Sequence, residues 1–400
     1  MKTTRADPQP ADFTDVRATN LAVVLRHLRA NGPSSRASIA ASTGLNKATV
    51  SSLAGALIEQ RLLRETGLSG NRIGRPGTAL TLDGSAYAAI GLQIAADRLT
   101  ALAVDFAGDQ LLLWHRAFDG GPATTGPGRA VSAVAALAQR AATRVRQQGR
   151  QVLGLTVAVP GLVDGGGTVR LSPPLGWADV DLRALLSGSL RQPGLDVSVA
   201  NHAGLAAVAE LRHGGHPTLD LTYVTGAAGI EAGIVVDGRP LHGSRGFTGQ
   251  IGRFSLGPAG ALTLADLAGI EPLVRRALPG FGPEPVTDLT PAVDHLAALA
   301  RAGDAGALSA LHDTGCHLGQ GLALLANLVN PEVIVLGDHY AALAEWLVPA
   351  AAAELARNTL APSGGGARLV ASTLGLHAAA LGGAVSHLDR VDTGVLPTNT

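Results

Sequence analysis

The first regular pattern along the chain is a set of apolar residues at helical spacing. Between residues 16 and 30, Leu21, Val24, Leu25 and Leu28 fall on one side of a helix, and a glycine followed by a proline ends it. The pattern therefore predicts an amphipathic helix over 16–30. Residues 1–15 lack such a pattern, and we expect them to be disordered.

Two shorter helices with a tight turn between them are predicted within the stretch from residue 32 to residue 60. Gly44 allows the positive φ that a helix end needs, and Asn46 suits the N-cap of the next helix. Val50, Leu53 and Leu57 follow at i, i+3 and i+7, so they form one buried face. The side chains left outside at the leading end are Lys47, Thr49, Ser51 and Ser52. Such an end is typical of a helix that reads DNA bases, and the alternative is an ordinary helical hairpin.

A basic loop between two short strands follows the helices. Strands are predicted over 62–66 and 78–82, and three helices followed by a hairpin make a winged helix-turn-helix domain, here residues 16–85. On the wing, Arg72 and Arg75 are flanked by glycines, which suits entry into a narrow minor groove. The alternative is a solvated loop whose arginines touch only phosphate. Arg36 is expected to contact a phosphate.

From residue 86 the pattern changes to that of an α/β fold. Buried strands alternate with Ala-rich helices, and the order of three strands, a helix and a strand begins again near residue 221. The predicted strands are 89–94, 98–105, 110–116, 152–159 and 333–337, with a strand, turn and returning strand over 221–238. The predicted helices are 129–148, 313–328 and 376–388. Two related lobes are implied, with a cleft between them where ligands usually bind.

The charge distribution separates a basic head from an acidic body. Residues 1–85 carry 11 Lys and Arg against 6 Asp and Glu, and the rest of the chain carries 20 against 25. This asymmetry fits a nucleic-acid-binding module joined to a body with another task.

Other compositional features exclude several classes of protein. No apolar run reaches the roughly 18–20 residues of a membrane span, and the first residues lack the apolar segment of a signal peptide. The single cysteine, Cys316, excludes a disulfide framework and a Cys-rich zinc site. We therefore expect a cytoplasmic protein that does not bind membranes.

Several separate motifs, in order, resemble those of the ROK family of repressors and sugar kinases. In the head they are SRASIA at 35–40, TGL at 43–45 and GRP at 74–76. In the body they are VPGLVD at 159–164, LGW at 175–177, NHA at 201–203, NPEVIVLG at 330–337 and STLG at 372–375. The resemblance implies a two-lobed body of the actin/hexokinase (ribonuclease H-like) type. Its first lobe would be 86–200, joined by the C-terminal helix 372–390, and its second lobe 201–371, with a dimerisation surface.

Both phosphate loops of the family's kinases are altered in this chain. The first, Asp-x-Gly-x-Thr in the kinases, is QIAAD at 93–97, and the second is AAGIEAG at 227–233. Glu231 replaces a glycine there and would repel a triphosphate. The position of the catalytic Asp holds His202, which we interpret as lining a pocket rather than as a base. The resemblance therefore implies no catalytic residue, no enzyme activity and no cofactor, against the alternative of a sugar kinase with a DNA-binding head.

The family's zinc site is also replaced. Its one His and three Cys ligands correspond to Arg253, Phe254, Leu256 and Ala261, so we expect no metal, and we expect apolar packing by Phe254 and Leu256 instead.

The predicted effector site combines retained and altered residues of the family's sugar pocket. Its members are Gly161, Asn201, His202, Gln250, Arg253 and Thr263. Gln250 and Thr263 stand where the family has glutamates, so they would bond a hydroxyl without charge assistance. The expected effector is a sugar, an amino sugar or a sugar phosphate, whose phosphate could pair with Arg245 or Arg253. The alternative is a pocket that has lost its ligand.

The sequence thus predicts a DNA-binding transcriptional regulator that represses genes of carbohydrate uptake or metabolism. Its expected partners are operator DNA, a small effector bound between the lobes, and further copies of itself in a homodimer or tetramer. A ligand-independent DNA-binding regulator is the remaining alternative.

Overall fold

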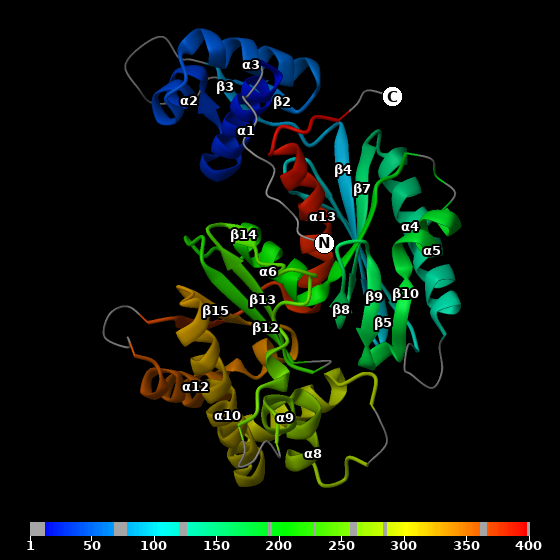
Figure 1. The fold of residues 1–400 in the computed structure, drawn as a ribbon, viewed down its shortest axis with the longest axis vertical. Coiled ribbons are helices and arrows are strands. Elements are labelled where there is room, and N and C mark those ends of the chain that lie inside the picture. The colour runs from blue at the N-terminus through cyan, green and yellow to red at the C-terminus, as the bar shows by residue number, and fades with distance from the viewer. Residues whose placement is uncertain are drawn as a thin grey trace.

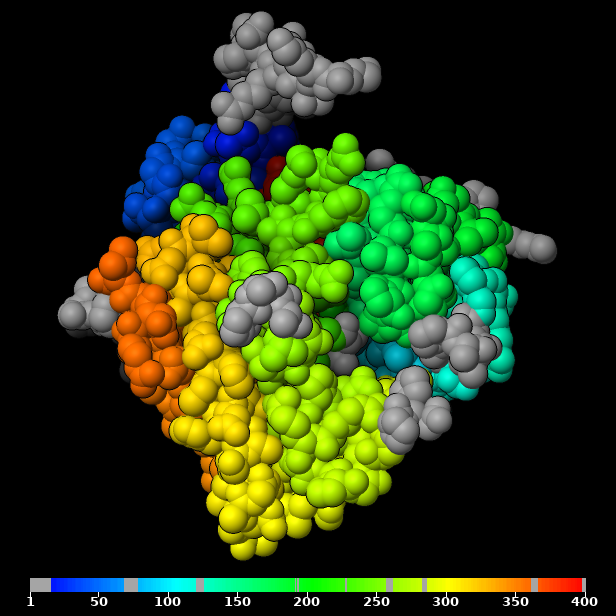
Figure 2. All heavy atoms as spheres, turned by 60° about the horizontal axis from the view of Figure 1, so that its bottom comes forward, coloured from blue at the N-terminus to red at the C-terminus, as the bar shows by residue number. Residues whose placement is uncertain are grey.

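The chain folds into a small helical head and a larger two-lobed body (Figure 1). This computed structural model describes residues 13–67, 78–119, 126–190, 192, 194–226, 229–256, 262–282, 286–360 and 366–397. The space-filling view places the blue head at one end of the molecule and the yellow residues of the second lobe at the other (Figure 2).

The head has three helices and a short sheet, as the sequence predicts. Its helices are α1 (Phe13–Asn31), α2 (Arg36–Thr43) and α3 (Lys47–Glu59). Its strands are β1 (Ser34–Ser35), β2 (Leu63–Thr66) and β3 (Ala79–Leu82), in the order β1-β3-β2. Leu25, Leu28, Val50 and Leu57 are buried, which confirms the predicted apolar faces. The two-residue strand β1 was not predicted, because it is too short for any periodicity.

The first lobe is built on a five-stranded mixed sheet in the order β11-β7-β4-β5-β6. The strands are β4 (Tyr87–Ile94), β5 (Arg98–Asp105), β6 (Gln110–Ala117), β7 (Gln151–Val159) and β11 (Val197–Asn201). The helices are α4 (Pro127–Gln147), α5 (Leu182–Leu190) and the C-terminal α13 (Ala378–Val391). A second small sheet, which the sequence did not reveal, contains β8 (Leu162–Val163), β9 (Thr168–Ser172) and β10 (Trp177–Asp181).

The second lobe repeats this strand arrangement. Its sheet order is β14-β13-β12-β15-β16, so β12 takes the central place of β4, and β13 and β15 take those of β5 and β7. The strands are β12 (Leu221–Thr225), β13 (Glu231–Val236), β14 (Arg239–Pro240), β15 (Val333–Leu336) and β16 (Arg368–Ala371). The helices are α6 (His202–His213), α7 (Leu264–Ala268), α8 (Ile270–Ala277), α9 (Thr290–Arg301), α10 (Ala305–Val329), α11 (Asp338–Ala342) and α12 (Ala344–Asn358). The predicted pair of related α/β lobes is therefore confirmed.

Two helices, α6 and α13, lie between the lobes and pack directly on each other (Figure 1). Gly382 of α13 faces the carbonyl oxygen of Leu205 in α6, and a Cβ at Gly382 would collide with it. Gly91 of β4 and Gly233 of β13 allow the same close approach of α13 and α6 to the two sheets. These glycines allow each sheet to pack closely against one of the two helices. A rotation of one lobe against the other would therefore change the packing between α6 and α13.

Across the described part of the chain, no helix is both long enough and apolar enough to cross a membrane.

Candidate functional site

The predicted reading helix is α3, and its cap is formed as expected. The Asn46 side chain accepts a hydrogen bond of 2.7 Å from the Thr49 backbone N–H, and Gly44 adopts φ 76° before it. Lys47, Ser51 and Ser52 are exposed on the helix, and Thr49 is partly exposed. The cap fixes the leading turn, so these side chains project from a rigid frame, as base-reading residues must.

The other predicted DNA contacts are placed differently. Arg36 begins α2, and its guanidinium lies 2.7 Å from the Glu65 carboxylate on β2. Both side chains are solvent-accessible, at 32% and 49%, so a phosphate would compete with a weak surface ion pair. Arg72 and Arg75 lie outside the described residues, and their contacts remain predictions.

In the body, three of the predicted ligand residues converge on Glu231 at the start of β13. The Gly161 N–H donates to its carboxylate at 3.0 Å, the Asn201 amide donates at 2.6 Å, and His202 Nε2 lies 3.3 Å away. The Asn201 amide also donates to the Gly161 carbonyl at 2.7 Å, and its oxygen caps α6 at the Gly204 N–H. The polar groups expected to hold a ligand are thus already bonded to one another and to Glu231.

This cluster contains a buried ion pair. Glu231 is 6% exposed and His202 is 8% exposed. Burial alone would lower the pKa of His202, but the nearby Glu231 carboxylate outweighs it and raises the His202 pKa overall. Burial would likewise raise the pKa of Glu231, yet His202 and the donors of Asn201 and Gly161 together lower it. Both pKa shifts favour the charged forms, so a buried anion stands in the segment that resembles the second phosphate loop of the family's kinases.

The remaining predicted ligand residues lie in surface turns that follow β14. Gln250 precedes a short 3-10 turn (Ile251–Arg253), and the Arg253 side chain is exposed. The Thr263 hydroxyl is used to cap α7 in a reciprocal pair with Asp266. Among the contacts of the described residues, none joins these three side chains to Glu231.

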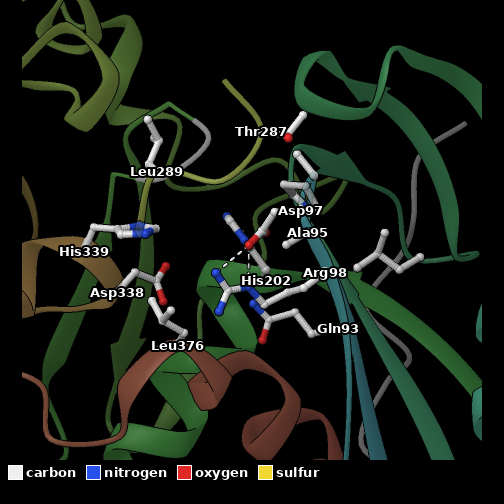
Figure 3. Close-up of a pocket in the computed structure, with 13 residues that line it drawn as sticks. Gln93, Ala95, Asp97, Arg98, His202, Thr287, Leu289, Asp338, His339 and Leu376 are labelled. Atoms are coloured by element: carbon white, nitrogen blue, oxygen red, sulfur yellow. Dashed lines mark hydrogen bonds and ion pairs between the residues drawn. The ribbon is translucent and has the colours of Figure 1, made fainter. Parts of the chain in front are cut away.

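A cavity opens in the cleft beside the Glu231 cluster (Figure 3). Its first-lobe wall comes from the end of β4 and the following turn, including Gln93 and Arg98, and its second-lobe wall includes Asp338 and His339. His202 is the one predicted ligand residue among the described residues that line this cavity. Sequence reasoning missed Asp338 and His339, although they come one residue after the buried strand β15, and ligands gather at such strand ends.

The region of the family's zinc site is filled by apolar side chains. Phe254 and Leu256 pack against the core of the second lobe, as expected, and the Phe254 carbonyl accepts from the Leu264 N–H at 2.7 Å. In the described ranges, no three His, Cys, Asp or Glu side chains gather as a metal-binding group. Ala261 lies outside those ranges, so the absence of zinc stays a prediction.

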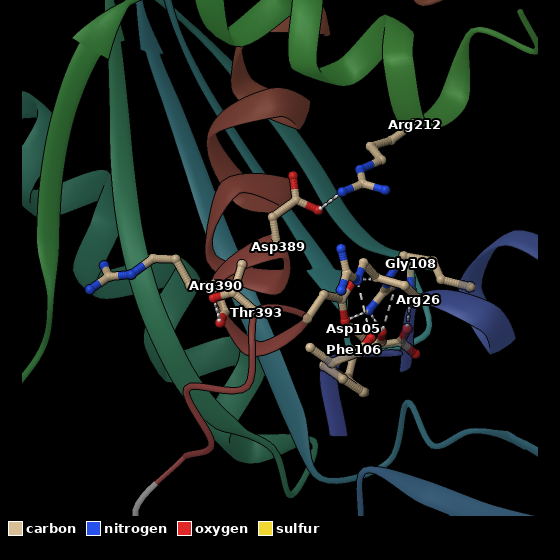
Figure 4. Close-up of polar contacts among 11 residues, drawn as sticks. Arg26, Asp105, Phe106, Gly108, Arg212, Asp389, Arg390 and Thr393 are labelled. Atoms are coloured by element: carbon tan, nitrogen blue, oxygen red, sulfur yellow. Dashed lines mark hydrogen bonds and ion pairs between the residues drawn. The ribbon is translucent and has the colours of Figure 1, made fainter. Parts of the chain in front are cut away.

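The head is joined to the body by a clamp at the end of α13 (Figure 4). Arg29 of α1 binds both oxygens of Asp392, and its guanidinium donates to the Phe106 carbonyl at 3.2 and 3.3 Å. The side chains are 15% and 2% exposed, and Arg29 also lies over the Phe106 ring. One turn earlier on α13, Asp389 pairs with Arg212 at the end of α6 at 2.7 Å. The head therefore contacts the same end of α13 that α6 contacts.

A capped reading helix on a head that is clamped to two kinase-like lobes defines a DNA-binding transcriptional regulator. The IclR helix-turn-helix domain matches residues 18–67, and the ROK family matches residues 89–389. The chain belongs to the ROK family.

Individual relatives agree with this assignment. The chain is 26% identical over 379 residues to the xylose repressor of Bacillus spizizenii, covering 93% of this chain and 95% of that one. The solved structure of a ROK family transcriptional regulator, described as a homologue of the Escherichia coli MLC protein, superposes with a TM-score of 0.78. It is 22% identical and covers 96% of this chain and 98% of its own. A ROK hexokinase from Thermus thermophilus covers 76% of this chain and 99% of its own, with 29% identity and a TM-score of 0.58.

Proposed function

We propose that this regulator is a repressor of genes for carbohydrate uptake or metabolism, released from its operator by a sugar-like effector bound between the lobes. The observation that carries the proposal is the path from cleft to head. His202, which lines the cleft cavity, begins α6. In the last turn of α6, Arg212 pairs with Asp389 of α13, and Asp392, directly after α13, pairs with Arg29 of the head. A ligand that favours one arrangement of the lobes would therefore act on the position of the reading helix. The xylose repressor among the relatives supports a sugar as the effector class.

We infer that this regulator has no kinase activity. A kinase needs a loop that binds the phosphates of ATP. In this chain the Glu231 carboxylate lies in the corresponding segment and accepts hydrogen bonds from Gly161 and Asn201. A second anion within about 4 Å of a buried carboxylate would be strongly repelled.

Calorimetry of the purified chain with ATP and Mg²⁺ should therefore show no binding, and elemental analysis should show less than one zinc per chain. The family's kinase from T. thermophilus is the matched positive control for the nucleotide titration. Stoichiometric zinc would contradict the correspondence of Arg253, Phe254, Leu256 and Ala261 with the family's zinc ligands. ATP binding would favour the alternative of a sugar kinase.

Operator recognition is expected to depend on the leading turn of α3. Lys47→Ala and Ser51→Ala should each weaken specific binding by about 1–3 kcal/mol per lost base contact. Fluorescence anisotropy with an operator found by binding-site selection and with a random duplex measures the difference. Ser42→Ala, at an exposed position of α2, is the matched control and should leave both affinities unchanged. An equal loss on both duplexes would show that Lys47 and Ser51 touch only the backbone.

The effector is tested on the same operator complex. Addition of the right sugar should weaken operator binding by about 5–150-fold, the usual range of such coupling. The expected homodimer requires two half-sites related by two-fold symmetry, about one or two helical turns apart. If no sugar changes operator affinity, the ligand-independent regulator becomes the better description.

A further inference from the structure

The cleft cavity in Figure 3 is lined by polar side chains of both lobes whose atoms lack partners. Gln93 on β4 and His339 on α11 are each 9% exposed. Within the described chain, Gln93 Oε1 and His339 Nδ1 have no hydrogen-bond partner. Buried polar atoms are seldom left unpaired, because each costs about as much as a lost hydrogen bond. The cavity is therefore equipped for a ligand that supplies those bonds.

The charges around the cavity limit what that ligand can be. The carboxylates of Asp97 and Asp338 line it, and the guanidinium among its described lining residues is that of Arg98, which also pairs with Asp288 at 3.4 Å. Burial lowers the pKa of His339, so this ring is neutral at neutral pH. An anionic ligand would meet an excess of negative charge, whereas hydroxyl or amino groups would find carboxylate and amide acceptors.

The apolar part of the lining suits the faces of a sugar ring. Leu289 and Leu376 line the cavity from the second lobe and the segment before α13, and Pro160 lines it from the end of β7. Apolar walls with a few placed polar groups are typical of small-molecule sites. Arg98 already reaches across, donating to Thr290 at 2.9 Å, so the two walls are held at a defined separation.

We propose that the effector of this regulator is a small hydroxyl-rich molecule without a phosphate, bound in this cavity between Gln93 and the Asp338–His339 pair. The predicted site at Gly161 and Asn201 is then not the binding place, because both residues already donate hydrogen bonds to Glu231. This inference rests on the proposed function, since it places the effector that the proposed function requires. A ligand at this position touches both lobes at once, which is what control of their arrangement needs.

The test is calorimetry of the full chain with D-xylose, D-glucose and D-glucosamine, each compared with glucose 6-phosphate. We expect at least one of the first three to bind, and glucose 6-phosphate to bind at least tenfold more weakly than glucose. Gln93→Leu and His339→Leu should each weaken the bound sugar at least tenfold. Gln148→Leu is the matched control, because its Oε1 is also unpaired among the described residues but lies at the end of α4, outside the cavity. Circular dichroism checks that each variant is folded.

The outcomes separate this inference from the proposed function. Loss of sugar binding in Gln250→Leu, with retention in Gln93→Leu and His339→Leu, would place the effector in the family's pocket and overturn the inference alone. Equal affinity for glucose and glucose 6-phosphate would also overturn it. If no probe binds at 10 mM and none changes operator affinity, both the inference and the effector in the proposed function are wrong.

Discussion

Arg29→Ala is expected to lower the free energy of unfolding by about 3–5 kcal/mol, because it leaves the carboxylate of Asp392 buried without its cation. The variant also loses the hydrogen bonds to the Phe106 carbonyl. Urea unfolding of the full chain measures the loss. Since the clamp joins the head to α13, the response of operator affinity to the effector should fall together with stability.

The matched control for this variant is Arg26→Ala, on the preceding turn of the same helix. Arg26 is exposed and donates to the backbone carbonyl of Ala22 at 3.2 Å, so its replacement should cost less than about 1 kcal/mol. If Arg29→Ala is as stable as Arg26→Ala, the clamp contributes little to the free energy of unfolding. An unchanged effector response would show that the signal reaches the head by another path.

Glu231→Ala is expected to cost a similar amount, about 3–5 kcal/mol, because the Gly161 N–H and the Asn201 amide lose their acceptor and the buried His202 loses its carboxylate. Glu231→Gln keeps an oxygen for one or two of these donors and should cost less. Glu65→Ala is the exposed counterpart, since it breaks the surface pair with Arg36, and should cost at most about 1 kcal/mol. A Glu231→Ala protein as stable as Glu65→Ala would mean that the cluster is not closed in solution.

The stability that this pair provides should depend on pH in a defined direction. The pKa of His202 is raised, so its contribution is complete below the ordinary histidine value of about 6.5 and is lost as pH rises through the folded value. The pKa of Glu231 is lowered, so its contribution is complete above about 4.3 and is lost as pH falls through the folded value. The difference in unfolding free energy between the parent chain and Glu231→Gln should therefore be larger at pH 5.5 than at pH 9. An equal difference at both pH values would show that the pair is not ionised.

The local pattern of the sequence determined the helices of the head and the central strands of both lobes. The three helices of the head follow from apolar spacing and from Gly44 and Asn46 as boundary residues, and the central strands of both lobes follow from short buried runs, whereas β11 and β16 were not predicted. These signals act over a few residues, so they are readable without any partner. The strands β1 and β8 are too short to carry such a signal, and they form only because a neighbouring strand offers its backbone.

Contacts between distant parts of the chain were decided by the tertiary structure alone. From the sequence, Glu231 was a charge that repels phosphate, and Asn201 was the amide expected to hold a ligand. The pairing of β12 with β13 brings the Glu231 carboxylate to Asn201 and to Gly161, which lie 30 and 70 residues away, and uses their hydrogen bonds. Arg29 and Asp392 meet across 363 residues in the same way. Periodicity says which face of an element is buried, but which buried polar groups meet depends on how whole elements pack, and that is not written in any short stretch of sequence.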